Sequence, residues 1–177
     1  MNILFIILSV IGGIIALFLL IALLTKKECI IEKQVIINKS KDEVFNYVKL
    51  IRNQEKYSVW VMKDPNIKLL YAGMDGTVGF TSSWTSEDKN VGVGAQEIIA
   101  IQEGESISME LRFKKPFEAT NYATTTVTAL SANQTKLSNV FSGKSAFPMN
   151  IMNLFMEKLV GRDMQQNLDN VKKILEG

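Results

Sequence analysis

The sequence predicts an α+β protein: a curved antiparallel sheet wrapped around a long C-terminal helix, preceded by one transmembrane helix. Three observations lead to this prediction. The chain begins with a long apolar run, continues with alternating polar and apolar segments separated by turn residues, and ends with a segment of helical periodicity. Short connections between alternating segments favour antiparallel hairpins, and such a sheet has one apolar face for a helix to cover.

The apolar run extends from Ile3 to Leu24, 22 residues without a charge, and is followed by Lys26 and Lys27. At ~1.5 Å per residue, it is long enough to cross a hydrocarbon core of about 30 Å. A cleaved signal would need a basic start, a shorter apolar stretch and small residues at a cleavage site, and these are not found here. We therefore expect a membrane anchor over residues 1–27 and one folded domain over residues 28–177.

The charges that flank the apolar run predict its orientation. Lys26, Lys27 and Lys33 follow the run, whereas only the terminal amine precedes it. Because cytoplasmic flanks are enriched in Lys and Arg, we expect a single-pass membrane protein whose domain faces the cytoplasm. The alternative is that the lysines act as interfacial anchors without topological meaning. The lone Cys29 cannot form an internal disulfide, which agrees with a reducing compartment.

The composition restricts the classes of function. The 20 basic and 18 acidic residues give a net charge of +2, without the clustered Lys and Arg of a nucleic-acid-binding surface. The chain has no His and one Cys, so a Ser-His-Asp or Cys-His triad cannot be assembled and a zinc site is not expected. The sequence contains neither of the two glycine-rich motifs that bind phosphate groups, G-x-x-x-x-G-K-[ST] and G-x-G-x-x-G. We expect no cofactor, no metal ion and no nucleic-acid partner.

The first elements of the domain are a strand and a helix. Ile30 to Ile37 is rich in β-branched residues and predicts a strand. Ser40 and Glu43 form a capping-box pattern, and the apolar stripe that follows predicts a helix to about Ile51. A break is expected between Asn53 and Ser58, and a turn at Asp64-Pro65-Asn66.

Six alternating segments after that turn predict the other strands. They are Ile67 to Ala72, Gly79 to Thr85, Val93 to Gln102, Ser106 to Phe113, Thr120 to Leu130 and Gln134 to Ser142. The alternation is clearest in the fourth of these, where Met109 and Leu111 are expected to point inward and Glu110 and Arg112 outward.

A long helix is predicted from about Pro148 to Leu175. Its second half is amphipathic, with Met164, Leu168 and Val171 on one stripe. The first half, Met149 to Val160, has little polar face. It must therefore bury two sides, line a cavity or contact lipid.

Short motifs along the chain add to this order of elements. They are Ser40 to Phe45, Gly79 with Trp84, Asn90 to Gly94 with Glu97, Phe113 with Pro116-Phe117, Ser142-Gly143 with Phe147-Pro148-Met149, and Gly161-Arg162-Asp163 leading to Leu168 and Lys172-Lys173. From Ile30 to Gly177 the chain resembles the helix-grip fold of the START-like superfamily, and within it the bacterial polyketide cyclase/dehydrase-like family of SRPBCC proteins. Members of this family can also carry an N-terminal membrane segment.

The resemblance implies a deep pocket between the sheet and the C-terminal helix, suited to apolar or amphipathic small molecules. It does not imply one common reaction, because this fold hosts many functions. Related sequences often place a Trp in the last strand, where this chain has Asn139, so pocket features that depend on that ring are not expected.

The predicted pocket would be lined by inward strand positions and by the Met-rich start of the helix, since Met adapts to varied apolar partners. The candidate ligand-binding residues are Trp60, Phe80, Trp84, Ile99, Met109, Leu111, Tyr122, Phe141, Met152 and Met156. Each of them could instead be a plain core residue.

Candidates for chemistry are fewer, and no catalytic residue is assigned. Glu97, Glu110, Arg112 and Tyr122 lie on strands, but Glu110 and Arg112 are expected to form a solvated cross-strand pair, and a surface role is favoured for Glu97. Three functions stay open. They are a membrane-tethered module that binds or transfers a lipid or hydrophobic small molecule, an enzyme of cyclase or dehydratase type, and an interaction module with a filled core and an unknown protein partner. We favour binding over chemistry.

Overall fold

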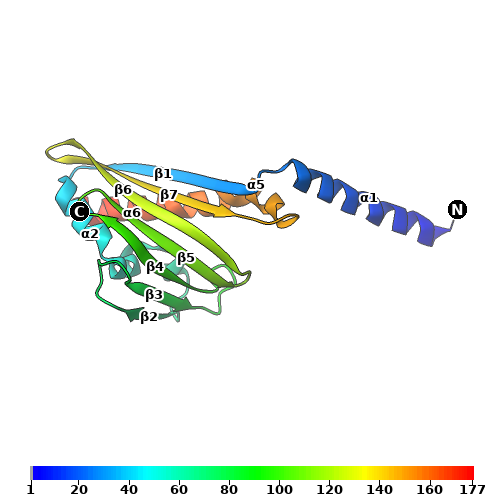
Figure 1. The fold of residues 1–177 in the computed structure, drawn as a ribbon, viewed down its shortest axis with the longest axis horizontal. Helices are drawn as coiled ribbons and strands as arrows, with labels where there is room; N and C mark the ends of the chain where they lie inside the picture. Colours follow the sequence, from blue (N-terminus) through cyan, green and yellow to red (C-terminus); the bar gives the residue numbers. More distant parts are fainter. Residues whose placement is uncertain (1) are drawn as a thin grey trace.

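The structure is a computed structural model that describes residues 2–177. Its first element is the helix α1 (Ile3–Leu24), which projects from one end of the domain (Figure 1). The side chains of α1 are exposed along its length, except for Ala22, which is buried against the domain. This helix is long and apolar enough to cross a membrane.

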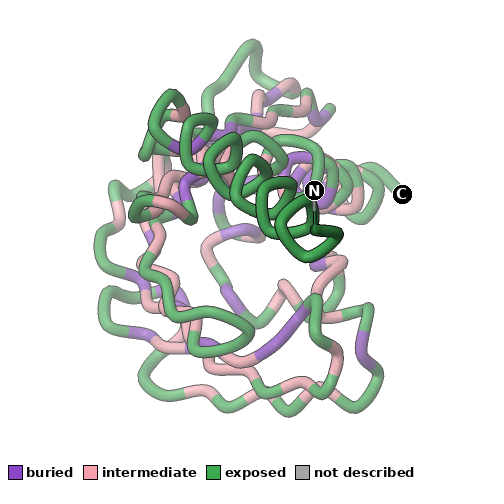
Figure 2. Tube along the Cα trace, turned by 90° about the vertical axis from the view of Figure 1, so that its right-hand side faces the viewer, coloured by how far each residue is buried: buried purple, intermediate pink, exposed green. Residues whose placement is uncertain are grey.

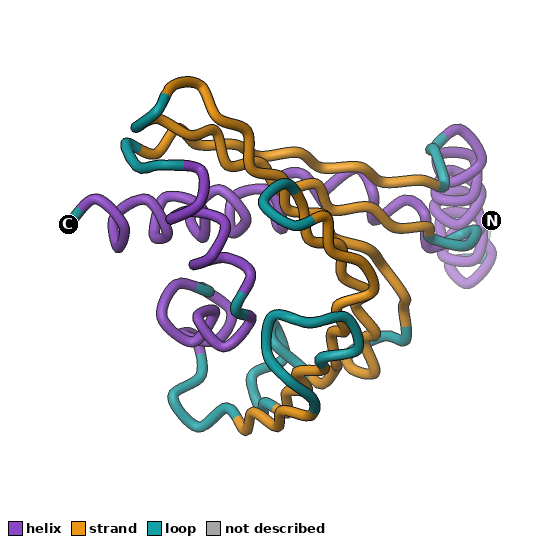
Figure 3. The backbone as a smooth tube through the Cα atoms, turned by 60° about the vertical axis from the view of Figure 1, so that its left-hand side comes forward, coloured by secondary structure: helices purple, strands orange, loops and turns teal. Residues whose placement is uncertain are grey.

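The domain is built on one antiparallel sheet of seven strands in the order β1-β7-β6-β5-β4-β3-β2. The strands are β1 (Glu28–Ile37), β2 (Lys68–Ala72), β3 (Thr81–Thr85), β4 (Val93–Gln102), β5 (Ser106–Lys115), β6 (Ala119–Ser131) and β7 (Gln134–Lys144). Every predicted strand is present, with ends shifted by two residues or fewer. The sheet curves, and the helices other than α1 lie on its inner side (Figures 2 and 3).

Four short helices connect β1 to β2: α2 (Lys41–Lys49), η1 (Ile51–Asn53), α3 (Gln54–Tyr57) and α4 (Val59–Lys63). The predicted capping box is confirmed, because the Glu43 amide donates to Oγ of Ser40 and the Ser40 amide donates to the Glu43 carboxylate. The predicted helix ends at Lys49, slightly earlier than expected.

The main core lies between the inner face of the sheet and helices α2 and α6 (Arg162–Glu176). The register places Phe141, Ala123, Met109 and Ile98 in one cross-strand row of this face. The largest fully buried side chains of the main core include Phe45 and Phe80. Burial of such an aromatic side chain contributes about 1.5–3 kcal/mol. The apolar stripes predicted in the two helices are therefore confirmed as core.

The C-terminal helix is present but not continuous, which corrects the prediction of one helix from Pro148. It begins as the 3-10 turn η2 (Met149–Met152), continues as α5 (Asn153–Met156) and the π-helical turn η3 (Glu157–Gly161), and becomes regular only in α6. The reason is tertiary, because a side chain of η2 binds the end of α1, a side chain of α5 binds the residues that follow α1, and Gly161 packs beside a side chain of β1.

Candidate functional site

A partly open apolar cluster lies between the sheet and the C-terminal helix, at the end of the domain that carries α1. Three of its side chains are buried, and four others are only half-buried against them. We call it the anchor-end cluster; its members are Ile31, Phe141 and Met164, with Cys29, Trp60, Met156 and Val160. The cluster is therefore less completely buried than the main core.

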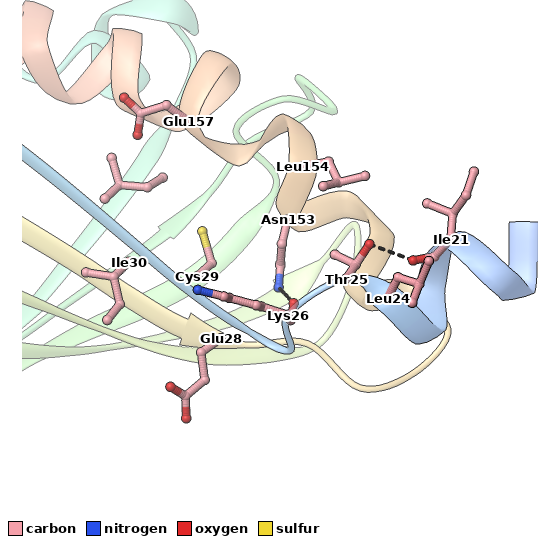
Figure 4. A pocket seen from close by; sticks show the side chains of 11 residues that line it. Ile21, Leu24, Thr25, Lys26, Glu28, Cys29, Ile30, Asn153, Leu154 and Glu157 are labelled. Atoms are coloured by element: carbon pink, nitrogen blue, oxygen red, sulfur yellow. Dashed lines mark hydrogen bonds between the residues drawn. The ribbon is translucent and has the colours of Figure 1, made fainter.

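A groove of about 550 Å³ lies at the junction of α1, β1 and α5 (Figure 4). Ile21, Leu24 and Leu154 form apolar parts of its wall, whereas Glu28 and Glu157 bring charge. The volume is within the range of about 300–1,000 Å³ usual for small-molecule sites. A groove with both apolar and charged parts suits an amphipathic molecule.

The groove and the anchor-end cluster meet at two residues of β1. Cys29 and Ile31 line the groove and also belong to the cluster. The sulfur of Cys29 points toward the C-terminal helix (Figure 4). The groove at the end of α1 is therefore adjacent to the interior side of the sheet, without an intervening element.

Two asparagines hold α1 against the start of the C-terminal helix, and we call them the asparagine clamp. The buried Asn150 donates through Nδ2 to the carbonyl oxygens of Ala22 and Thr25, both at 2.7 Å. Asn153 donates to the carbonyl oxygens of Lys26 and Lys27, at 3.0 and 3.2 Å. Because the last carbonyls of a helix lack partners within it, the Asn150 amide satisfies groups at the end of α1 that would otherwise need water, while Asn153 binds the segment that follows the helix.

An ion pair joins β1 to the π-helical turn above the groove. Lys33 occupies an inward position of β1 and donates from Nζ to Oε1 of Glu157 at 2.5 Å. Gly161 leaves the space for this contact, since a Cβ there would lie 3.0 Å from Cε of Lys33 and 3.2 Å from the Glu157 carboxylate. The pair connects the edge strand to the C-terminal helix.

The structure brings some of the predicted ligand-binding residues together. Trp60, Phe141 and Met156 belong to the anchor-end cluster. Phe80 and Met109 are buried in the main core, and Leu111 packs against it. Trp84 is half-buried on the inner side and packs edge-on against Phe113, with ring centroids 5.7 Å apart.

Three other predicted residues lie apart from this group. Ile99 occupies a β-bulge of β4 and is 43% exposed. Tyr122 points to the outer face, where its hydroxyl donates to Glu110 at 3.4 Å and its ring lines a second depression of about 330 Å³. Met152 is exposed on η2.

Several residues at the site were not among the predicted ones. Ile31 could have been found, because the alternation of β1 already placed it on the same face as Val35 and Ile37. Leu24 and Leu154 could not, since each lies in a segment that is apolar all round and nothing local shows that the two meet.

The candidates for chemistry lie on the outer face of the sheet. Glu110 and Arg112 are not a cross-strand pair, which corrects the expectation, because both belong to β5 and lie two residues apart; the cross-strand ion-pair partner of Arg112 is Glu97 of β4. Arg112 donates to Glu97 at 2.9 Å and to Glu110 at 2.5 Å. These hydrogen bonds, first of all that to Glu97, raise the pKa of the Arg112 guanidinium. Within residues 2–177, no three His, Cys, Asp or Glu side chains gather into a group that could hold a metal ion.

Cys29 is expected to be a weak nucleophile. Burial raises the pKa of its thiol above the ordinary value, and the nearby Glu157 carboxylate raises it further. Because the thiolate is the reactive form, iodoacetamide should alkylate Cys29 more slowly in the folded than in the denatured chain at neutral pH. The alkylation rate of Cys29 should continue to rise at pH values where an ordinary thiol is already fully ionised, because the pKa of the Cys29 thiol is raised. Mass spectrometry across a pH series measures this; steric protection alone would lower the rate without moving its midpoint.

Comparisons with known structures agree with this fold. The aromatase/cyclase ZhuI from Streptomyces sp. R1128 has a TM-score of 0.63 and 13% identity, over 84% of this chain and 94% of that one. Norcoclaurine synthase from Thalictrum flavum, solved with dopamine and hydroxybenzaldehyde, has a TM-score of 0.63 and 13% identity, over 89% and 91%. A protein of Chromobacterium violaceum has a TM-score of 0.57 and 17% identity, over 84% and 97%. At such identities the likeness shows the fold alone, and it confirms the helix-grip arrangement.

The family is shown by sequence. No curated protein matches the chain. The sequence model of the family described as polyketide cyclase / dehydrase and lipid transport matches residues 28–176. Because this match covers most of the chain, the protein belongs to the polyketide cyclase / dehydrase and lipid transport family, as the resemblance to START-like SRPBCC proteins predicted.

Proposed function

We propose that residues 28–177 bind a lipid or another hydrophobic small molecule between the sheet and the C-terminal helix, and that residues 1–27 anchor this domain to a membrane. The observation that carries the proposal is the anchor-end cluster, whose half-buried apolar side chains meet the groove at the end of α1. The family, whose description includes lipid transport, supports a ligand-binding domain.

Several features support the anchor. The helix α1 is uncharged over its 22 residues and exposed along nearly all of its length. In water such a surface would be costly, whereas a bilayer would cover it. Lys26 and Lys27 follow the helix directly, which favours a cytoplasmic location for the domain.

Binding is favoured over chemistry by the distribution of polar groups. Glu97, Glu110 and Arg112 pair with one another on the outer face of the sheet, away from the anchor-end cluster. The cluster itself consists of apolar side chains and one thiol. A general acid or base needs to reach the ligand, and these three side chains point to the opposite face.

Trp60 offers a direct test, because the chain has two tryptophans and only this one belongs to the anchor-end cluster. The full chain with Trp84→Phe is placed in nanodiscs of phosphatidylcholine and phosphatidylglycerol and titrated with a dibrominated fatty acid, which quenches nearby indole. We expect saturable quenching of Trp60. Met156→Asp, which puts a charge in the cluster, should weaken binding about tenfold or more, corresponding to ~1.4 kcal/mol.

Leu70→Asp is the matched control, because Leu70 is exposed on β2, outside the cluster. It should leave the titration unchanged. Equal affinity for Met156→Asp and Leu70→Asp, or quenching that does not saturate, would contradict the proposed site.

A further inference from the structure

We infer that the start of the C-terminal helix, from Phe147 to Leu159, docks on the same bilayer that holds α1. We call this segment the docking face. The inference rests on the proposed membrane anchor and adds a second membrane contact, made by the folded domain itself. Its partner is the interfacial region of a phospholipid bilayer.

The docking face has an unusual density of exposed apolar side chains. Six of them lie within this short segment, each between 43% and 57% exposed: Phe147, Met149, Met152, Leu154, Phe155 and Leu159. Contiguous exposed apolar patches of this kind mark sites of interaction with a protein, a ligand or a membrane. The contact of the segment with α1 and the charges around it favour a membrane over a protein or a ligand.

The asparagine clamp places the docking face at the level where α1 ends. Asn150, in the first turn of the segment, bonds to the carbonyl oxygens of Ala22 and Thr25. Leu24 is the last residue of the apolar helix, so the boundary of the hydrocarbon core would lie close to it. Figure 1 shows the same arrangement, with α5 at the end of the domain nearest to α1. The apolar side chains are therefore held beside the membrane boundary.

The charges near the docking face fit a phospholipid surface. Lys26 and Lys27 follow α1, and Lys158 is exposed within the segment. The acidic neighbour Glu157 is paired with Lys33. Basic residues beside an apolar face favour the anionic headgroups of the cytoplasmic leaflet, and the apolar side chains of such a face enter about 5–10 Å into the headgroup and acyl boundary.

Docking would also give the groove a direct opening to lipid. Leu154 belongs to the docking face and, with Ile21 and Leu24 of α1, lines the groove. A lipid could then pass from the leaflet into the groove and on to Cys29 and Ile31 of the anchor-end cluster without crossing water. The broken start of the helix thus serves as the entrance of the binding site.

Single-site fluorescent labels test this inference in the full chain. In a Cys29→Ser background, which removes the only cysteine, Phe155→Cys and Leu159→Cys are labelled with an environment-sensitive nitrobenzoxadiazole dye. Leu70→Cys and Leu130→Cys are matched controls, since both positions are exposed and apolar but lie on β2 and β6. Ile14→Cys, in the middle of α1, reports on insertion of the anchor. All are placed in nanodiscs of phosphatidylcholine and phosphatidylglycerol with and without nitroxide-labelled lipid.

We expect blue-shifted emission and strong nitroxide quenching at Phe155→Cys, Leu159→Cys and Ile14→Cys, and neither at the two control positions. Quenching at Ile14→Cys with water-like emission at Phe155→Cys and Leu159→Cys would leave the anchor intact and overturn the docking face alone. Blue-shifted emission of the two docking-face labels without quenching by nitroxide lipid would indicate a contact with protein, and this result would also overturn the docking face. An unquenched label at Ile14→Cys would remove the anchor and the docking face together.

Discussion

Gly92→Ala is expected to destabilise the domain by about 3 kcal/mol or more, a loss in the exceptional range for one substitution. Gly92 has φ of +65°, and a Cβ there would lie 2.1 Å from the carbonyl oxygen of Lys115. The turn has little freedom to move away, because the Gly92 amide donates to the Asp88 carbonyl and its own carbonyl accepts from the Ser86 amide. Urea denaturation followed by circular dichroism measures the loss.

Gly104→Ala is the matched control for this prediction. Gly104 has φ of +72°, so alanine incurs a similar left-handed backbone cost of roughly 1–2 kcal/mol, but its Cβ would meet nothing within 4 Å. The two variants therefore separate backbone conformation from steric overlap. Similar losses for both would show that the contact between Gly92 and Lys115 has no energetic weight.

Asn150→Leu should release the end of α1 from the domain, at a cost of about 2–4 kcal/mol in the stability of this junction. Leucine keeps the volume but leaves the carbonyl oxygens of Ala22 and Thr25 without their donor, and each buried unpaired group costs roughly 1–3 kcal/mol. The Ser145 amide, which donates to the Lys27 carbonyl, is a local reporter. Its hydrogen exchange in nanodiscs should accelerate by about two orders of magnitude.

Asn153→Leu provides the comparison. Asn153 makes longer bonds, of 3.0 and 3.2 Å, to the exposed Lys26 and Lys27, where water can replace the lost donor. Its effect on exchange should be clearly smaller, corresponding to about 1 kcal/mol or less. If Asn150→Leu left the exchange of the Ser145 amide unchanged, the asparagine clamp would not determine how α1 meets the domain.

Most of the fold could be predicted because its elements have strong local patterns. Alternation placed Met109 inward and Arg112 outward on β5, and the capping box of Ser40 and Glu43 marked the start of α2. The apolar run from Ile3 to Leu24 corresponds to one helix. Such patterns record, residue by residue, which side of an element faces the core.

The candidate site could be predicted only in part. Trp60, Phe141 and Met156 lie in the anchor-end cluster, but Ile99 and Tyr122 lie apart from it. Ile99 is displaced by a bulge that interrupts the alternation of β4. In β6, Tyr122 stands among polar and small residues, so no clear apolar alternation marked its face.

The sequence by itself determined the apolar helix α1, the seven strands and the helices α2 and α6, because a regular helix or strand depends on neighbouring residues. The tertiary structure alone decided that Asn150 binds the end of α1 and that Asn153 binds Lys26 and Lys27, all more than a hundred residues away. It also decided that the C-terminal helix begins with irregular turns. These features depend on which distant backbone groups need a partner when the elements come together. A local sequence pattern does not predict which side chain will bind these groups, since every helix ends with unpaired carbonyls whatever its sequence.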